Sequence, residues 1–316
     1  MLSPAQRHRA RVLQEKAQQQ AAAADPHGEL TGDAYQLMLA KLAADRRHLK
    51  GLQSITRKCE VKAQLLPAYF DWIAEALRSG TGAQDRVLST CMVWAIDAGA
   101  YTLALDIAAY VLAHGLTLPD QFERTPAVAV IDELSTAYLT GKWAPLEVGQ
   151  TDDGKPALVG TPYSSASPAE QLATTARLLM RALELTTGHD APDQARAKLH
   201  KAIAYAALGK VQTAEDPDLA ALSPERLAVA QEHLQRALQL ASDSGVKKDI
   251  ERVTRRAAAL QAQTEAEAKG QASAQLQPDS AAKPAAPAAS STSTEHPADP
   301  PRPRTPKRGP AKSRGH

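Results

Sequence analysis

Aromatic side chains are so scarce in this 316-residue chain that Ala and Leu must supply much of its packing. Phe, Trp and Tyr together make up 4% of the residues, although hydrophobic residues as a whole reach 43%. Strands prefer aromatic and β-branched residues, whereas Ala, Leu, Gln and Arg are good helix formers. The chain therefore predicts an all-α fold, and its length suffices for one large domain or two small ones.

Serine–proline pairs mark the starts of several predicted helices. Ser3-Pro4-Ala5-Gln6 and Ser167-Pro168-Ala169-Glu170 both have the sequence of a capping box with proline at the first helical position. Ser223-Pro224 and Thr125-Pro126 are weaker starts of the same kind. With the spacing of apolar residues, these signals predict helices over residues 4–23, 33–65, 68–79, 83–97, 100–114, 126–140, 168–187, 192–208, 223–242 and 246–268.

Composition and charge divide the chain into five segments. We expect a basic helical region for DNA binding or oligomerisation over 1–65, an acidic helical core over 66–140, a Pro/Gly-rich linker over 141–167, C-terminal helical hairpins over 168–269, and a disordered basic tail over 270–316. Net charge is +5 over residues 1–62 and −6 over 63–140. This segregation indicates one part that faces a polyanion and another that faces proteins.

The C-terminal hairpins are expected to be partly tetratricopeptide-like. Ala230, Leu234, Ala237 and Leu238 have the spacing of the second helix of such a pair. A regular period of about 34 residues is absent, so the sequence predicts antiparallel hairpins and not a true repeat array. Helical hairpins commonly present surfaces that bind other proteins.

Several classes of protein are excluded. No apolar run approaches the roughly 20 residues that a membrane span needs, and the N-terminus lacks the apolar core of a signal peptide. The two cysteines, Cys59 and Cys91, exclude a disulfide framework and a four-cysteine zinc site, which favours a reducing compartment. The chain has no P-loop, GxSxG or HExxH motif, and no histidines at a metal-ligand spacing, so we expect no metal and no cofactor.

One weak pattern resembles that of a metal-dependent nuclease. Pro119-Asp120 is followed about thirty residues later by Asp153-Gly154-Lys155. In such enzymes the acids hold Mg²⁺ while the lysine polarises water, which requires rigid geometry on adjacent strands. Asp120, Asp153 and Lys155 are therefore catalytic candidates only if the nuclease alternative and its Mg²⁺ hold. We expect them to be turn residues between helices.

Basic residues gather in the predicted second helix around one apolar stripe. The stripe is Leu39, Leu42, Leu49, Leu52 and Ile55, and the pattern is equally typical of a helix that contacts DNA and of a coiled-coil oligomerisation element. Pairs one turn apart, such as Arg46 and Lys50, could grip neighbouring phosphates. The predicted DNA-binding residues are Arg7, Arg9, Arg11, Arg46, Arg47, Lys50, Arg57, Lys58 and Lys62.

An ordered set of short strings over residues 3–256 resembles the GpM-type small terminase subunit of Peduovirus-type tailed phages. The strings are Ser3-Pro4-Ala5-Gln6-Arg7-His8, Lys41-Leu42-Ala43-Ala44-Asp45, Leu65-Leu66-Pro67, Gly82-Ala83-Gln84-Asp85, Trp94 with Asp97 and Gly99, Tyr110 with Gly115-Leu116-Thr117, Arg124-Thr125-Pro126, Ala195-Arg196-Ala197-Lys198-Leu199-His200-Lys201, and Gly245-Val246-Lys247-Lys248 with Ile250-Glu251-Arg252.

The resemblance implies a role in viral DNA packaging. A subunit of this kind recognises the packaging site, here a cohesive-end site, on concatemeric double-stranded DNA. It delivers that DNA to the large terminase subunit, which supplies the ATPase, in the cytoplasm of the bacterial host. The resemblance also implies a homo-oligomer, and the family carries the label terminase endonuclease subunit. The residues themselves favour a subunit without a catalytic site, with an independent nuclease and a helical adaptor without DNA contact as alternatives.

Overall fold

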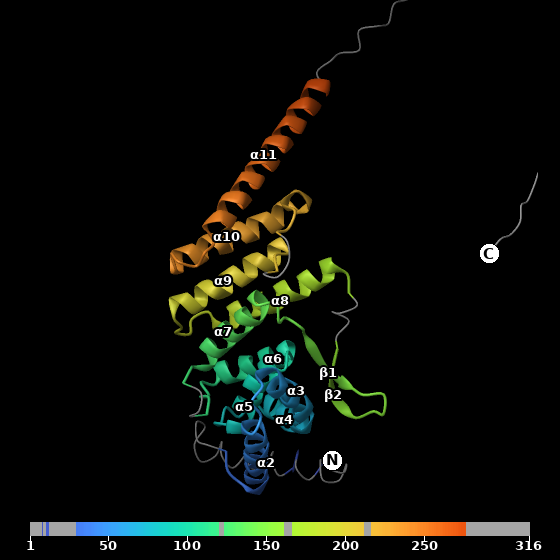
Figure 1. Ribbon diagram of the computed structural model, residues 1–316, viewed down its shortest axis with the longest axis vertical. Helices are drawn as coiled ribbons and strands as arrows, with labels where there is room; N and C mark the ends of the chain where they lie inside the picture. The colour runs from blue at the N-terminus through green and yellow to red at the C-terminus, as the bar shows by residue number, and fades with distance from the viewer. Residues whose placement is uncertain are drawn as a thin grey trace, which may run out of the picture. The chain divides into compact units, whose positions relative to one another are not determined.

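The computed structural model describes residues 8, 11–12, 30–119, 123–160, 166–211 and 216–275, with side chains as far as residue 269. Contacts within the chain divide it into two units, residues 1–266 and residues 267–316. The described part is mainly helical and carries one two-stranded antiparallel sheet. The predicted all-α fold is therefore confirmed (Figure 1).

The elements follow one another along the chain with short connections. The helices before the sheet are α2 (Asp33–Lys50), α3 (Ile55–Leu65), the 3₁₀ helix η1 (Leu66–Tyr69), α4 (Phe70–Ser79), α5 (Arg86–Asp97), α6 (Tyr101–Ala113) and α7 (Pro126–Leu139). The sheet consists of β1 (Leu146–Gln150) and β2 (Pro156–Gly160). After it come α8 (Pro168–Thr186), α9 (Asp193–Leu208), the 3₁₀ helix η3 (Leu219–Ala221), α10 (Pro224–Leu240) and α11 (Lys247–Gln275).

The prediction of one continuous helix over residues 33–65 is wrong, because the chain breaks between Lys50 and Ile55. The amide of Gly51 still donates to the carbonyl oxygens of Arg47 and His48, at 3.3 and 3.1 Å, and so closes α2. The Ser54 hydroxyl then accepts the amide of Arg57 at 3.2 Å and starts α3 as its N-cap. Glycine is a poor helix former and serine a good N-cap, which explains the break.

The segment 141–167 is also not the plain loop that we expected, because β1 and β2 form a hairpin within it. The pairing runs from Leu146 opposite Gly160 to Gln150 opposite Pro156. The many glycine and proline residues of this segment indicate the turn and the strand ends of a hairpin, and not only the end of a helix. The helices before and after the hairpin belong to the same compact unit.

Serine and threonine caps lie where the sequence places them. Ser167 and Glu170 form the predicted capping box at the start of α8. Thr125 and Ser223 accept backbone amides at the starts of α7 and α10. The corresponding box at Ser3 lies outside the described residues, as does most of the predicted helix 4–23.

The C-terminal boundary differs from the prediction. α11 continues past residue 269 as far as Gln275, so residues 270–275 are helical and are not part of a disordered tail. Residues 276–316 lie outside the described part of the chain.

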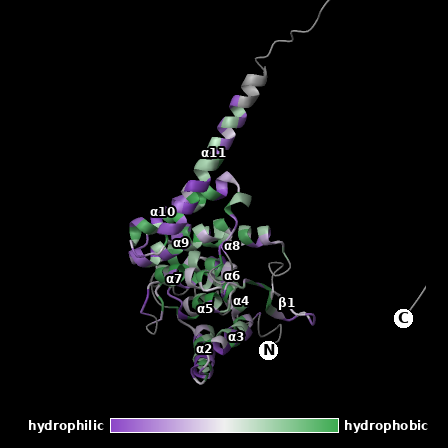
Figure 2. Cartoon of the chain, turned by 45° about the horizontal axis from the view of Figure 1, so that its top comes forward, coloured by the Kyte–Doolittle hydropathy of each residue, from purple (hydrophilic) through white to green (hydrophobic). Residues whose placement is uncertain are grey.

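The core is a continuous hydrophobic cluster that includes α5 and α6, and it holds aromatic side chains such as Tyr35, Tyr69 and Trp94 among the aliphatic ones. Every residue of α5 from Val87 to Ile96 is buried, and both helices are drawn mainly in the hydrophobic colour in Figure 2. In the C-terminal half, buried alanines of α9 face Ala230, Leu234 and Ala237 of α10, whose side chains are fully enclosed. Small residues allow these helices to approach closely, as expected for hairpins of this type. No helix in the described ranges is long and apolar enough to cross a membrane.

Candidate nucleic-acid interface

Basic side chains from α2 and α3 line an open hollow of about 410 Å³. Burial of Leu42 and Leu49 fixes the inner face of α2, so its basic residues point outward. The break at Gly51 lets α3 turn and add its own basic residues to the same surface. The hollow is lined by Ala43, Arg46, Arg47, Leu49, Lys50, Lys58, Lys62 and Trp94, which include five of the nine predicted DNA-binding residues. We call this surface the α2–α3 hollow.

The base of the α2–α3 hollow is apolar and firmly packed. Trp94 of α5 is only 3% exposed, and its ring meets that of Tyr69 edge to face with 6.0 Å between centroids. Tyr69 donates its hydroxyl to Asp45 at 2.6 Å, and Lys41 pairs with the same carboxylate at 2.6 Å. Burial and this hydrogen bond raise the pKa of Tyr69 well above its usual value, so the hydroxyl stays protonated. The basic side chains therefore project from a rigid support.

The predicted DNA-binding residues differ in whether their charge is already neutralised. Lys62 forms an ion pair with Asp97, and Arg57 pairs with Glu60 at 2.8 Å. No ion pair holds Arg46, Arg47, Lys50 or Lys58 within the described part of the chain. Four positive charges at the rim of the α2–α3 hollow are therefore available for an anion.

In the acidic segment 63–140, in contrast, several carboxylates are already neutralised by ion pairs. Asp97 and Asp106 pair with Lys62 and Arg181, and Glu75 pairs with Arg78. The first two pairs join segments that are distant in the sequence, so they connect different helices of the fold.

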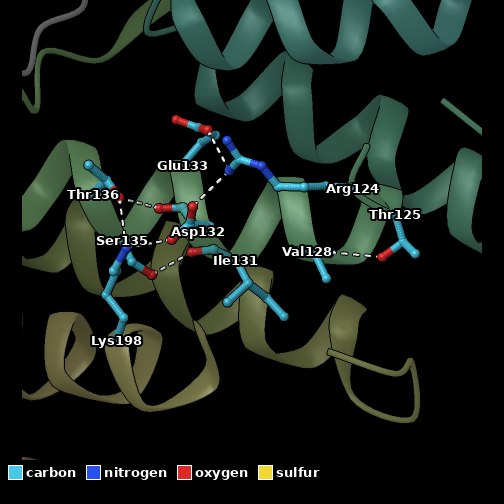
Figure 3. Close-up of polar contacts among 9 residues, drawn as sticks. All are labelled: Arg124, Thr125, Val128, Ile131, Asp132, Glu133, Ser135, Thr136 and Lys198. Carbon is cyan, nitrogen blue, oxygen red and sulfur yellow. Dashed lines mark hydrogen bonds and ion pairs between the residues drawn. The ribbon is translucent and has the colours of Figure 1, made fainter. Parts of the chain in front are cut away.

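Ion pairs around α7 show how the carboxylates of Asp132 and Glu133 are neutralised (Figure 3). Arg124 donates to Asp132 at 2.7 Å and to Glu133 at 2.8 Å. From α9, Lys198 reaches the other oxygen of Asp132 at 2.5 Å and the hydroxyl of Thr136 at 3.3 Å. Two cations thus balance two carboxylates, and the contact of Lys198 fastens α9 to α7.

The pKa of the Cys59 thiol depends on charged groups near the α2–α3 hollow. Burial raises the pKa of Cys59, the Asp97 carboxylate raises it further, and Lys62 and Lys142 oppose this shift. Lys142, which follows α7, therefore lies close enough to α3 to add to the positive potential there. Sequence reasoning missed Lys142 because it is 80 residues away from Lys62 along the chain.

Of the three N-terminal arginines that we predicted to bind DNA, only Arg11 lies in the described part. Its side chain is exposed, and its guanidinium lies 3.2 Å from the Nδ1 atom of His8. Arg7 and Arg9 lie outside the described residues.

The two described nuclease candidates lie in the turn that joins β1 and β2. Asp153 is exposed and accepts hydrogen bonds from Lys155 and from the hydroxyl of Thr151, which together hold the pKa of its carboxyl below the usual value. The pattern's first acid, Asp120, lies outside the described residues. In the ranges that the structure describes, no three His, Cys, Asp or Glu side chains are grouped to hold a metal ion.

Comparisons with known proteins identify the family. The profile of the phage small terminase subunit family matches residues 39–151, which include the larger part of α2, all of α3 and the whole α2–α3 hollow. The terminase endonuclease subunit of Escherichia phage P2 is 37% identical over 255 residues, which cover 81% of this chain and 85% of that protein. No solved structure matches the chain. Because this similarity extends over most of both proteins, the chain belongs to the family of phage small terminase subunits.

Proposed function

We propose that this chain, which acts in phage DNA packaging, binds viral double-stranded DNA through the α2–α3 hollow. It recognises the packaging site, a cohesive-end site, on concatemeric DNA and delivers that DNA to the large terminase subunit, whose ATPase and nuclease act on it. This takes place in the cytoplasm of the bacterial host.

The observation that carries the proposal is the set of four cations at the α2–α3 hollow without an ion pair among the described residues. Arg46, Arg47, Lys50 and Lys58 come from two helices and share one concave surface. Clustered, uncompensated Lys and Arg side chains are the usual means of contacting a phosphate backbone. The acids that could neutralise them are already held by other partners.

A single hollow offers few contacts, so we propose that several protomers act together. Each protomer would contribute modest phosphate contacts, and linkage in a homo-oligomer would convert them into tight binding. The helical hairpins after residue 190 and the 63–140 segment would provide contacts between protomers or with the large subunit. The pairing of most acids in that segment favours the hairpins for this role.

The test is a charge reversal on α2. The variant Arg46→Glu/Arg47→Glu/Lys50→Glu should weaken binding to both cohesive-end and scrambled duplexes by more than about a hundredfold at 0.1 M salt. The slope of log affinity against log salt should fall by about three, one for each lost phosphate contact. Arg177→Glu is the matched control, because Arg177 is an exposed helical arginine on α8 outside the hollow.

Two results would contradict the proposal. An unchanged salt slope in the triple variant would exclude the α2–α3 hollow as the DNA surface. Absence of DNA binding by the unaltered protein, combined with capture of the large subunit, would leave the helical adaptor in its place. Thermal unfolding by circular dichroism should show that all variants are folded.

A second candidate is a metal-dependent endonuclease, which is favoured by the name of the relative from phage P2. The experiment is incubation of the purified protein alone with cohesive-end DNA and Mg²⁺. Cleavage that is lost in Asp120→Ala or Asp153→Ala would establish it. Intact DNA under conditions of tight binding would assign cutting to the large subunit.

A further inference from the structure

A second basic hollow, of about 350 Å³, lies between η3 and the N-terminal half of α11. Sequence reasoning did not propose its arginines as DNA contacts, because they lie in the segment 168–269 that we expected to form helical hairpins. The hollow is lined by Pro217, Asp218, Leu219, Ala220, Arg252, Arg255, Arg256 and Ala259. We call it the α11 hollow.

The three arginines of the α11 hollow are held in different ways. Arg252 is committed to acids, since it pairs with Asp216 at 2.7 Å and approaches Asp249 at 3.8 Å. Arg256 has no carboxylate partner among the described residues. Its Nε donates to the carbonyl of Leu219 at 3.2 Å and its Nη2 to that of Ala220 at 3.0 Å. The guanidinium of Arg256 is therefore fixed in place with its charge uncompensated.

Arg255 is the free member of the set. Its side chain is exposed, and no hydrogen bond or ion pair engages it within the described part of the chain. Asp216 pairs with both Arg252 and Lys210, whereas Asp218 accepts the amide of Ala220 at 2.8 Å and keeps its negative charge. One fixed guanidinium and one free guanidinium thus face the same hollow.

The lining of the α11 hollow fits a phosphate backbone better than a folded protein. Stable protein interfaces are built around aromatic and other large apolar side chains. This hollow contains no aromatic side chain, and its larger apolar residues are Leu219 and Pro217. Guanidinium groups present donors in a planar fork that matches phosphate oxygens.

We propose that the α11 hollow is a second contact for the DNA backbone, with Arg255 and Arg256 as the phosphate ligands. It shares no lining residue with the α2–α3 hollow, and Figure 1 shows α2 at the other end of the first unit from the start of α11. One protomer would then hold DNA at two places. The inference rests on the proposed DNA binding but concerns a different surface.

The experiment compares Arg255→Ala with its conservative counterpart Arg255→Lys and with the matched control Arg177→Ala. Duplex affinity is measured over a series of salt concentrations with the full chain. Arg255→Ala should lower affinity about fivefold to tenfold at 0.1 M salt and reduce the salt slope by about one. Arg255→Lys should keep the slope, because it keeps the charge, and Arg177→Ala should match the unaltered protein.

The possible failures are distinguishable. If the unaltered protein binds no DNA, the proposed function falls together with this inference. If the triple variant on α2 loses binding while Arg255→Ala behaves like Arg177→Ala, only the inference about the α11 hollow is overturned. It is also overturned if Arg255→Ala keeps its DNA affinity but loses capture of the large subunit, since the hollow would then be a protein contact.

Discussion

The imidazole rings of His200 on α9 and His233 on α10 lie 30° from parallel, with their Nδ1 atoms 2.8 Å apart. At this distance one Nδ1 must donate a hydrogen bond and the other must accept it. Both rings cannot carry a proton on Nδ1 without placing two donors face to face. The pair therefore joins the α9–α10 hairpin only while at least one ring is neutral.

The histidine pair should make the stability of the hairpin depend on pH. Burial lowers the pKa of His200 to about 4, helped by His233, Arg236 and Arg196, and burial also lowers the pKa of His233 against the opposing charge of Glu232. The unfolded chain therefore binds more protons below pH about 6.5, and stability falls as the pH falls from there toward 4. The contribution should be about 1 kcal/mol, reduced by partial solvent exposure.

Urea unfolding at pH 7.5 and pH 5.0 provides the measurement. His200→Gln/His233→Gln keeps a polar contact but cannot titrate, so it should lose less stability between the two pH values than the unaltered protein does. Equal losses in the double variant and the unaltered protein would mean that the pair does not contribute.

Asp85 should be one of the most sensitive polar positions in the fold. Its fully buried carboxylate accepts the amides of Val87 and Leu88 at 2.8 and 2.9 Å, and the indole N–H of Trp72 at 2.8 Å. Asp85→Ala would remove the N-cap of α5 and the carboxylate that accepts the buried indole N–H. We expect a loss of about 2–4 kcal/mol in the free energy of unfolding, measured by urea denaturation.

The pH dependence of Asp85 has the opposite sign to that of the histidines. Burial raises its pKa to about 6, although its three hydrogen bonds oppose the shift. The folded state then binds more protons than the unfolded state between pH about 4 and 6, so this group's contribution falls as the pH rises through that range. Asp85→Asn should abolish this decline, and a decline that persists in the variant would assign it to another group.

Gly99 lies very close to a backbone segment that is distant in the sequence. Its φ is +82°, and a Cβ atom there would lie 2.6 Å from the carbonyl oxygen of Ala144, where the chain enters β1. Gly99→Ala should therefore cost about 2–4 kcal/mol, from backbone strain plus displacement of the hairpin. Gly115→Ala, at φ +65° with no atom within 4 Å, should cost only about 1–2 kcal/mol from strain. Equal losses in urea unfolding would contradict this contact.

Helix positions could be predicted from the sequence because their signals are local. Each helix-start signal spans at most four residues, as in Ser167 with Glu170 and in Ser223 with Pro224. The structure has an N-cap at Ser167 and at Ser223. The break at Gly51 was visible in the same way, as a glycine followed by the N-cap Ser54. It was missed because the leucine spacing on either side suggested one stripe.

The candidate site was only partly predictable, because neutralisation of charge depends on tertiary contacts. Lys58 and Lys62 look equivalent in sequence, one helical turn apart. Only the fold brings Asp97 to Lys62 while it leaves Lys58 without an ion pair in the described part of the chain. The same holds for Trp94, whose place at the base of the α2–α3 hollow depends on the packing of α5 against α3.

The ion pair between Lys62 and Asp97 leads to a prediction of stronger DNA binding. Asp97 ends α5 and is 26% exposed, and its carboxylate neutralises Lys62 at the edge of the α2–α3 hollow. Asp97→Asn should release that charge, so DNA affinity should rise about fivefold to tenfold at 0.1 M salt and the salt slope should steepen by about one. Stability should change by less than about 1 kcal/mol, because the pair is partly exposed and a carboxylate at a helix C-terminus opposes the dipole.

The control for Asp97→Asn is Glu60→Gln, which frees Arg57 from its exposed ion pair outside the α2–α3 hollow. If affinity depends on the charge of the hollow, Asp97→Asn should strengthen binding more than Glu60→Gln does, although each variant removes one negative charge. Equal gains would show that net charge alone controls affinity. No gain in Asp97→Asn would mean that Lys62 does not face the DNA. Because loss of binding can follow from misfolding whereas gain cannot, this variant tests the position of the DNA surface more directly than any charge reversal.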